Sequence, residues 1–286
     1  MATTKINLAK EGKITSIEEA LDASNLNFIA QEEELISAGS MVVAPDHKAI
    51  IRPDTNTVLG LVGKNYSPTP NSRAFAFMDN IVQNQGYSYV EAVNKDDGAV
   101  SIITAQSDRP EEIQKGDIIC RQIKLINGFT GKHALSCEMS SVRLVCLNGM
   151  TTNERSSMIR FKHTVRLQDR MKIALEVFDQ SEKFHDKFIA TAKRMAEKAV
   201  DKAMVKKFLD GLYGDAGQNI KKKEKIEELF QYGKGNNGET LFDLYSGGTE
   251  FFNHFDSSDG KRLDSFTFGT SGKKNAQCWD LAMNLL

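Results

Sequence analysis

Turn residues divide the stretch from residue 87 to residue 146 into four runs rich in β-branched and aromatic residues. The first two runs, YSYVEAV and AVSIITAQ, are joined by Lys95-Asp96-Asp97-Gly98, and an Asp-Gly pair is a strong hairpin signal. The next two, GDIICRQIKLI and ALSCEMSSVRLVC, are separated by a segment that contains Asn127-Gly128 and Gly131. Strands joined by hairpins pair antiparallel, so this part of the chain predicts an antiparallel sheet rather than a doubly wound parallel one.

The segments before this sheet carry further helix and hairpin signals. Ser16 and the acidic residues after it predict a short helix over residues 16–24. Two apolar runs around the turn residues 53–56 predict a hairpin over residues 47–63. A third pattern predicts a helix over residues 71–85, with an Asn cap and an exit at Gly86.

After the sheet the pattern becomes helical. Apolar residues recur at steps of three and four from residue 166 to residue 209, which indicates one long helix or a helix pair. A polar connection follows at residues 211–225, and three short helical segments complete the chain. We therefore expect an α+β fold in which an antiparallel sheet packs on a long helix. The expected division is an α+β core over residues 1–165 and a helical region over residues 166–286.

Composition excludes several classes of protein. The chain has 286 residues, of which 40% are hydrophobic and 26% charged, and these values are typical of a folded globular protein. No apolar segment approaches the roughly 18 residues that a membrane span requires, so we expect no membrane association and a cytoplasmic location. The four cysteines form no CxxC pair, which predicts reduced core residues rather than a metal cluster.

Charge is distributed unevenly along the chain. The net charge is −1, but residues 160–225 contain 17 Lys and Arg against 10 Asp and Glu, a local net charge of +7. A cationic stripe attracts polyanions, although a solvated lysine-rich helix face has the same composition. The cations at the predicted sheet-to-helix junction and on the predicted sheet are the candidate nucleic-acid contacts: Arg155, Arg160, Lys162, His163, Arg166 and Arg170, together with Lys95, Arg121, Lys124, Lys132 and Arg143.

Aromatic residues and additional cations are further candidates for contacts with nucleic acid. Tyr66, Tyr87, Tyr89 and Phe129 are candidates for base stacking, although most aromatic residues in such positions pack in the core or in hairpins. More cations continue along the predicted helical segment: Lys193, Arg194, Lys198, Lys202, Lys206 and Lys207.

Catalytic readings receive less support. Cys146 and His163 match a nucleophile and a base by residue type, but no known nucleophile signature surrounds Cys146. The Gly-rich segments at residues 233–238 and 269–274 match no P-loop, and ordinary loops account for them better than phosphate cradles. No GxGxxG motif is present. We therefore expect no cofactor and no catalysis, and an enzyme that uses Cys146 or His163 stays the minority alternative.

Several segments in a fixed order carry a family resemblance. They are SIEEAL, IIRPDTNTVLGLVGKNYSPTPN, VRLVCLNGM, IRFKHT, TLFDLYSGGTEFFNH and GKKNAQCWDLAMNLL. This set resembles domain-of-unknown-function family 932, the phage/plasmid-like proteins, over most of the chain. The resemblance implies carriage by phages or plasmids in a bacterial host. One departure is SGGTE at residues 246–250, where the family pattern implies an Asn-Ala-like pair before Thr-Glu.

The predicted order of elements is also similar to the core of the single-strand annealing recombinases, of the lambda Red-beta and eukaryotic Rad annealing type. That resemblance implies ATP-independent annealing of single-stranded DNA by a homo-oligomeric ring or filament, with residues 155–170 beside the groove that holds the strand. It also implies a role in phage recombination or replication, with a phage exonuclease or a host single-strand binding protein as a further partner. The alternative is a non-enzymatic phage interaction protein, an inhibitor of host defence or a structural component, that binds an acidic partner.

Overall fold

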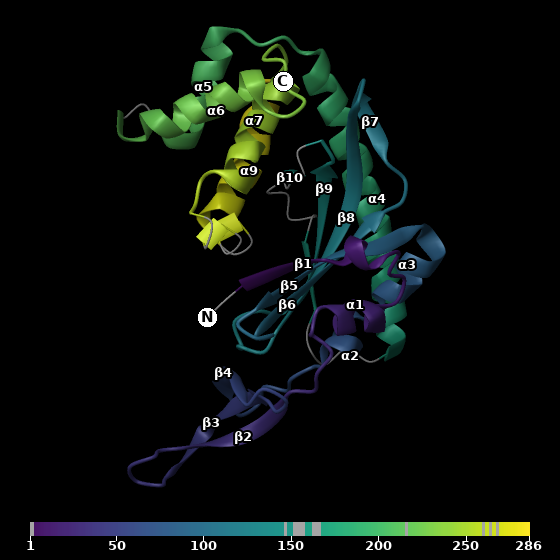
Figure 1. The fold of residues 1–286 in the computed structure, drawn as a ribbon, viewed down its shortest axis with the longest axis vertical. Coiled ribbons are helices and arrows are strands. Elements are labelled where there is room, and N and C mark those ends of the chain that lie inside the picture. Colours follow the sequence, from purple (N-terminus) through teal and green to yellow (C-terminus); the bar gives the residue numbers. More distant parts are fainter. Residues whose placement is uncertain are drawn as a thin grey trace. The chain divides into compact units, whose positions relative to one another are not determined.

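The computed structural model describes residues 3–145, 148–150, 158–161, 167–214, 217–258, 261–262, 265–266 and 269–286. Strands occupy mainly the first part of the chain and helices the last part (Figure 1). The strands are β1 (Thr3–Asn7), β2 (Gln31–Ile36), β3 (Val43–Arg52), β4 (Thr57–Gly63), β5 (Tyr87–Lys95), β6 (Val100–Ser107), β7 (Glu111–Gln114), β8 (Asp117–Gly128), β9 (Leu135–Arg143), β10 (Asn148–Met150) and β11 (Met158–Phe161). The helices are η1 (Leu8–Glu11), α1 (Ile17–Ala23), α2 (Asn71–Phe75), α3 (Met78–Gln85), α4 (Leu167–Glu197), α5 (Lys202–Tyr213), η3 (Gly217–Asn219), α6 (Ile220–Tyr232), α7 (Leu241–His254) and α9 (Thr270–Met283).

The chain divides into two compact units, and neither is a single continuous segment. The first unit comprises residues 1–108, 123–138 and 158–179, and the second comprises residues 109–122, 139–157 and 180–286. Strands β8 and β9 and helix α4 each contribute residues to both units. The expected boundary at residue 165 separates strands from helices along the sequence, whereas the compact units are defined by packing in space.

The sheet of the first unit is built from the predicted hairpins. Strand β5 pairs antiparallel with β1 on one side and with β6 on the other, and β11 pairs antiparallel with β9. The hairpin between β5 and β6 is confirmed. Its turn has positive φ at Asp96 (52°), Asp97 (58°) and Gly98 (95°), a conformation that Asp and Gly tolerate better than other residues.

Helices cover this sheet in the first unit. Ser16 caps α1 by accepting a hydrogen bond from the Glu19 amide, as predicted. In the first part of α4, Phe178 packs edge-on against Tyr87 of β5, with 6.4 Å between ring centroids. The expected packing of an antiparallel sheet on a long helix, in an α+β fold, is therefore confirmed.

The helix predicted over residues 71–85 needs two corrections. It is broken into α2 and α3, and its end at Gly86 is confirmed by a left-handed C-cap. Asn71 does not cap it. The Asn71 side chain is buried and donates hydrogen bonds to the Leu26 carbonyl and the Ser101 hydroxyl, both at 3.0 Å. The Asn71 side chain therefore binds groups far away in the sequence, although local sequence preference alone would place it at a helix cap.

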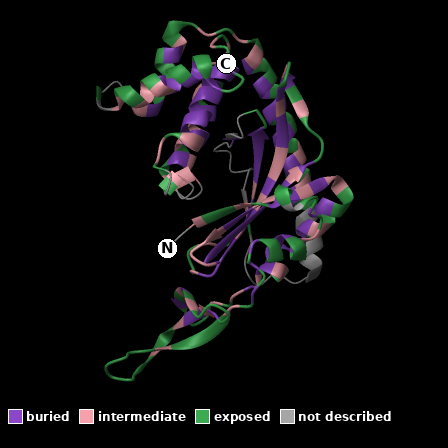
Figure 2. Cartoon of the chain, viewed as in Figure 1, coloured by how far each residue is buried: buried purple, intermediate pink, exposed green. Residues whose placement is uncertain are grey.

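A second sheet in the first unit has the order β2-β3-β4. The predicted hairpin over residues 47–63 is confirmed as β3 and β4, while β2 was missed because its sequence QEEEL lacks an apolar alternation. Buried Arg52 fixes the hairpin turn, since it donates to Asp54 and to the Asp97 carbonyl and lies 4.3 Å above the Phe28 ring. Figure 2 shows that much of this sheet is exposed.

The second unit is mainly helical and is centred on α7. Residues 241–252 of α7 are all buried, and Figure 2 shows this helix in the buried colour along its length. Thr240 and Asp243 form a capping box at its start. The predicted C-terminal helices are confirmed as α6, α7 and α9. The connection between α5 and α6 is shorter than predicted, because Lys221 and the residues after it belong to α6.

Close packing explains the two glycines of the SGGTE segment. A Cβ atom at Gly247 would lie 2.6 Å from the Phe230 amide nitrogen of α6. A Cβ atom at Gly248 would lie 2.9 Å from the Cys278 sulfur of α9. The departure from the family pattern therefore lies where α7 approaches its neighbours most closely. Cys278, Cys120 and Cys137 are buried and form no disulfide, as predicted, and Cys146 lies outside the described residues.

Candidate nucleic-acid interface

The predicted basic junction is only partly described by the structure. Arg155, Lys162, His163 and Arg166 lie outside the described residues. Arg170 belongs to the first turn of α4, and its side chain is also outside what the structure describes. Among the remaining candidates of the sequence, the sheet cations fall into two groups. Arg160 and Lys132 are exposed, and Lys95 and Lys124 are half-buried, whereas Arg121 and Arg143 have partners inside the protein.

Arg143 is not a nucleic-acid contact, because its side chain has no exposed surface. It ends strand β9 and forms an ion pair with Asp117 of β8, with 2.6 Å between its Nε atom and Asp117 Oδ1. The guanidinium also donates to the carbonyls of Lys234 and Gly235 and to Asn236 Oδ1, at 3.2, 2.8 and 2.7 Å. The prediction that Arg143 contacts nucleic acid was wrong, because Asp117, which is distant in the sequence, neutralises its charge.

The Gly-rich loop at residues 233–238 is shaped by this arginine. Its inward-facing carbonyl groups surround a cation, which is the opposite polarity to a phosphate cradle built from N–H groups. Gly235 has φ of +77°, and a Cβ atom there would lie 2.9 Å from Arg143 Nη2. The sequence therefore needs glycine at this position to admit the guanidinium, and an ordinary structural loop is the correct reading.

Arg121 is likewise held by acidic side chains. It lies on β8 and forms ion pairs with Glu111, at 2.9 Å, and with Glu182. Asp186 lies 3.8 Å away, and only 12% of the Arg121 side chain is exposed. Three carboxylates around one guanidinium leave no net positive charge for a phosphate, so this prediction was also wrong.

A serine, a histidine and a glutamate lie in line beside Arg121. The Ser141 hydroxyl is 3.1 Å from His185 Nδ1, and His185 Nε2 is 3.2 Å from Glu111. Nucleophilic attack needs a serine that substrate can reach, and Ser141 is fully buried within β9. Burial lowers the pKa of His185 to about 4, and the Arg121 charge lowers the pKa further while Glu111 opposes the shift. This group is best described as structural.

Acidification is expected to destabilise the protein through His185. Its folded pKa of about 4 is below the ordinary value of 6.5, so between these values the unfolded chain binds the additional proton. The stabilisation is complete above pH 6.5 and is lost as the pH falls toward 4. At about 1.4 kcal/mol per pH unit, roughly 2 kcal/mol should be lost from pH 7 to pH 5. Urea unfolding at both pH values should show a smaller loss for His185→Asn, and an equal loss in both proteins contradicts this account.

The aromatic residues considered for base stacking are mostly core residues. Tyr87, Tyr89 and Phe129 are at most 2% exposed, so the core reading is confirmed for them. Tyr66 is half-buried, and its hydroxyl donates to the Gly128 carbonyl at 2.7 Å. Sequence reasoning missed Tyr232, the most exposed aromatic residue among the described residues of the second unit, because no local pattern marks its side chain as exposed.

Exposed cations continue along α4 and α5 in the second unit. The sequence contains a run of cations here, and the structure shows that some of these cations bind groups within the protein. Lys198 donates to the Leu286 carbonyl, and Lys206 pairs with Asp210. In the described part of the second unit, five exposed cations of these two helices take part in no ion pair: Lys183, Lys193, Arg194, Lys202 and Lys207.

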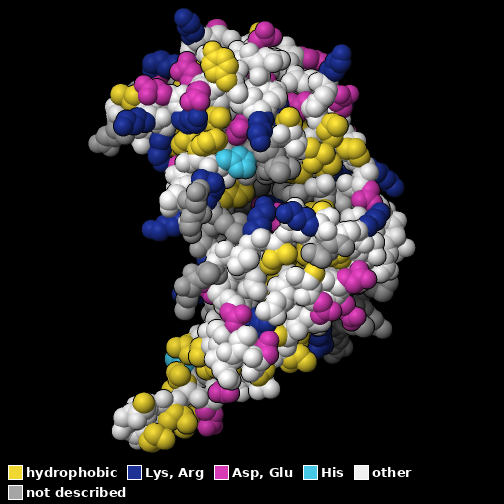
Figure 3. All heavy atoms as spheres, in the orientation of Figure 1, with side chains coloured by type: hydrophobic (Ala, Val, Ile, Leu, Met, Phe, Trp, Pro, Cys, Tyr) yellow, Lys and Arg dark blue, Asp and Glu magenta, His cyan; other side chains and the backbone are white. Residues whose placement is uncertain are grey.

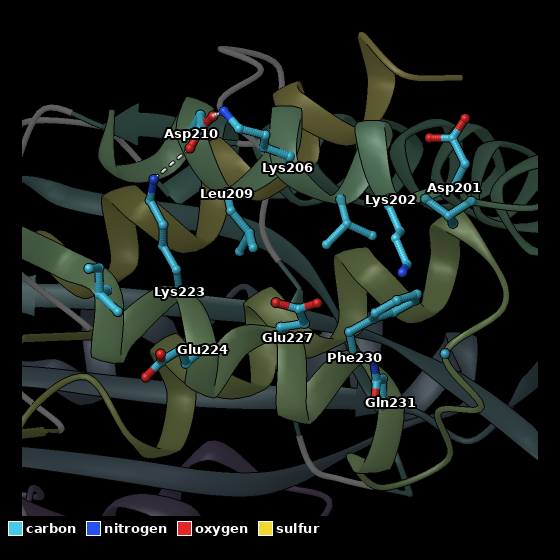
Figure 4. Close-up of a pocket in the computed structure, with 14 residues that line it drawn as sticks. Asp201, Lys202, Lys206, Leu209, Asp210, Lys223, Glu224, Glu227, Phe230 and Gln231 are labelled. Atoms are coloured by element: carbon cyan, nitrogen blue, oxygen red, sulfur yellow. Dashed lines mark hydrogen bonds and ion pairs between the residues drawn. The ribbon is translucent and has the colours of Figure 1, made fainter. Parts of the chain in front are cut away.

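A groove of about 480 Å³ lies between α5 and α6. Val205, Leu209 and Phe230 supply apolar lining, and charged side chains of both signs surround it. Figure 4 shows Lys206 and Lys223 reaching the same carboxylate, that of Asp210. Because Lys206 and Lys223 share Asp210, and further carboxylates line the groove beside Lys202, the groove offers no excess of positive charge to an anion.

Other kinds of site find no support in the described ranges. There, no three His, Cys, Asp or Glu side chains come together as a metal site would require. None of the helices in these ranges has the length and apolar character to cross a membrane.

Comparison with known proteins identifies the family. A family model described as Domain of unknown function (DUF932) matches residues 58–279, which is most of the chain. The chain belongs to this family. The resemblance to the unknown-function family is thereby confirmed. No curated protein and no solved structure matches the chain, so the likeness to annealing recombinases stays a prediction.

Proposed function

We propose that this member of the DUF932 family binds single-stranded DNA through the exposed cations of α4 and α5 and anneals complementary strands without ATP. The observation that carries the proposal is the set of five exposed cations on two consecutive helices of the second unit that form no ion pair among the described residues. Exposed cations outside ion pairs can neutralise phosphate groups, and each neutralised phosphate releases counterions. Base pairing then supplies the driving force for annealing, so the mechanism requires no catalytic residue.

The proposal includes assembly and context. A homo-oligomer, as a ring or a filament, would repeat the cation row along an extended strand, and phage recombination or replication is the setting in which such annealing is used. Binding by phosphate neutralisation is largely independent of sequence, so the proposal requires no base-specific contact.

Charge reversal tests this function directly. We expect the quadruple change of Lys193, Arg194, Lys202 and Lys207 to Glu to weaken binding of a fluorescent oligothymidylate by at least about 100-fold. For the wild type, the logarithm of affinity should fall with the logarithm of salt at a slope of about −0.7 per phosphate contacted. Anisotropy titrations at several salt concentrations measure both quantities, and an annealing assay with complementary strands measures activity.

A matched control reverses exposed lysines that already have acidic partners. Lys13 pairs with Asp108 and Lys64 pairs with Asp46, both in the first unit. Their change to Glu alters the net charge without touching the row on α4 and α5. Equal losses in the control and in the quadruple variant would contradict the assigned surface. Wild-type binding that does not depend on salt would contradict the electrostatic mechanism.

One observation favours the alternative of a protein-interaction role. Ile36, Met41, Val42 and Val43 are 41–73% exposed around the turn between β2 and β3. Figure 3 shows hydrophobic side chains gathered at this end of the sheet. Apolar clusters of this kind occur where proteins bind other proteins. Two results together would support this alternative. The wild type should bind neither single-stranded DNA nor duplex nor RNA, and it should bind a partner protein that the Met41→Glu variant does not bind.

A further inference from the structure

Tyr232 is the most exposed large hydrophobic residue in the described part of the chain. It ends α6, and 81% of its side chain is accessible to solvent. Large aromatic side chains lose favourable transfer free energy when they remain in water, so an aromatic residue in this position contributes little to folding. Tyr232 immediately precedes the Gly-rich loop at residues 233–238, and hydrogen bonds of buried side chains hold that loop.

That loop is fixed from its inner side. Arg143 holds the carbonyls of Lys234 and Gly235 and the Asn236 side chain. Asn236 Nδ2 donates to the Leu229 carbonyl at 2.8 Å, and the Gly233 amide donates to the same carbonyl at 2.9 Å. The end of α6 and the loop after it are therefore held by buried polar groups, while Tyr232 and Lys234 remain exposed.

We propose that Tyr232 stacks on a nucleobase of the bound single strand and that Lys234, two residues later, neutralises a neighbouring phosphate. This inference rests on the proposed function and adds a base-contacting residue to it. Stacking on an aromatic side chain tolerates any sequence, because every base has a π face. In a duplex both faces of an internal base are covered by its neighbours, so Tyr232 gives the protein a physical reason to prefer single strands. The anchored loop holds the ring in place before binding, which reduces the entropy lost on association.

Three probes separate stacking from charge: an oligothymidylate, an abasic strand of the same length and a duplex. Tyr232→Ala should weaken binding of the oligothymidylate about tenfold and leave binding of the abasic strand and the duplex unchanged. Tyr232→Phe keeps the ring and should bind as the wild type does. Ile29→Ala is the matched control, since Ile29 is a 70% exposed apolar residue outside α4, α5 and α6. Anisotropy titrations on the full chain give all these affinities, and circular dichroism verifies folding of each variant.

The outcomes distinguish this inference from the function on which it rests. Equal weakening on the oligothymidylate and the abasic strand would show that Tyr232 does not act by stacking, and unchanged oligothymidylate binding would remove Tyr232 from the interface. In both cases DNA binding by the wild type would leave the proposed function standing. A wild type that binds none of the three probes overturns the function and the inference together.

Discussion

Replacing Arg143 by methionine is expected to lower the free energy of unfolding by about 3–5 kcal/mol. Methionine keeps most of the side-chain volume but leaves the Asp117 carboxylate buried, at 4% exposure, without its cation. The carbonyls of Lys234 and Gly235 and the Asn236 side chain lose a donor at the same time. Urea unfolding followed by circular dichroism measures the loss.

The double change Arg143→Met with Asp117→Leu provides the control. Removing both charges leaves no isolated buried ion, so the double variant should be more stable than Arg143→Met alone. Lys64→Met, which breaks an exposed ion pair with Asp46, should change the stability by less than about 1 kcal/mol. If Arg143→Met costs no more than Lys64→Met, the buried cluster does not stabilise the second unit as described.

Replacing Gly247 by alanine is expected to destabilise the protein by about 3 kcal/mol or more, although alanine is the better helix former by about 1 kcal/mol. The new Cβ would lie 2.6 Å from the Phe230 nitrogen, 2.9 Å from the Phe230 Cα and 3.0 Å from the Leu229 carbonyl carbon. These are backbone atoms of α6, which no rotamer change can move. Relief therefore requires α6 and α7 to separate, with loss of packing along the core of the second unit.

Gly39→Ala is the matched control for this change. No atom lies within 4 Å of the position that a Cβ would occupy at Gly39, and its φ is not in the left-handed region. We expect the stability of this variant to stay within about 0.5 kcal/mol of the wild type. A Gly247→Ala protein as stable as Gly39→Ala would show that the two helices do not approach as closely as the structure places them.

Local chemistry accounts for most of the secondary structure that could be predicted. The turn at Asp96-Asp97-Gly98 uses residues that tolerate positive φ, and Ser16 caps α1 through an amide three residues away. Such signals act within a few residues, so the sequence shows them directly. Predictions were wrong where a residue distant in the sequence competed with a local preference. Asn71 was predicted as a helix cap, but its side chain is buried and donates hydrogen bonds to Leu26 and Ser101.

The candidate interface was predicted less well, for a related reason. Arginine has the same charge in any sequence, but its availability depends on acidic partners that the chain brings near it. Arg143 finds Asp117, 26 residues away in the sequence, and a loop more than 90 residues away. Lys193 and Lys202 form no ion pair among the described residues and keep their charge for solvent or a ligand.

The amino-acid sequence by itself determined the hairpins, the helical C-terminal region, the α+β class and the family, because turns, caps and periodicity are properties of neighbouring residues. Only the tertiary structure decided which cations are exposed and why glycine is needed at residues 235 and 247. Both depend on the approach of segments far apart in the chain. The cations that the sequence showed thus divide into different features: Arg143 is buried and fixes a loop, whereas cations of α4 and α5 form an exposed row that we propose binds DNA.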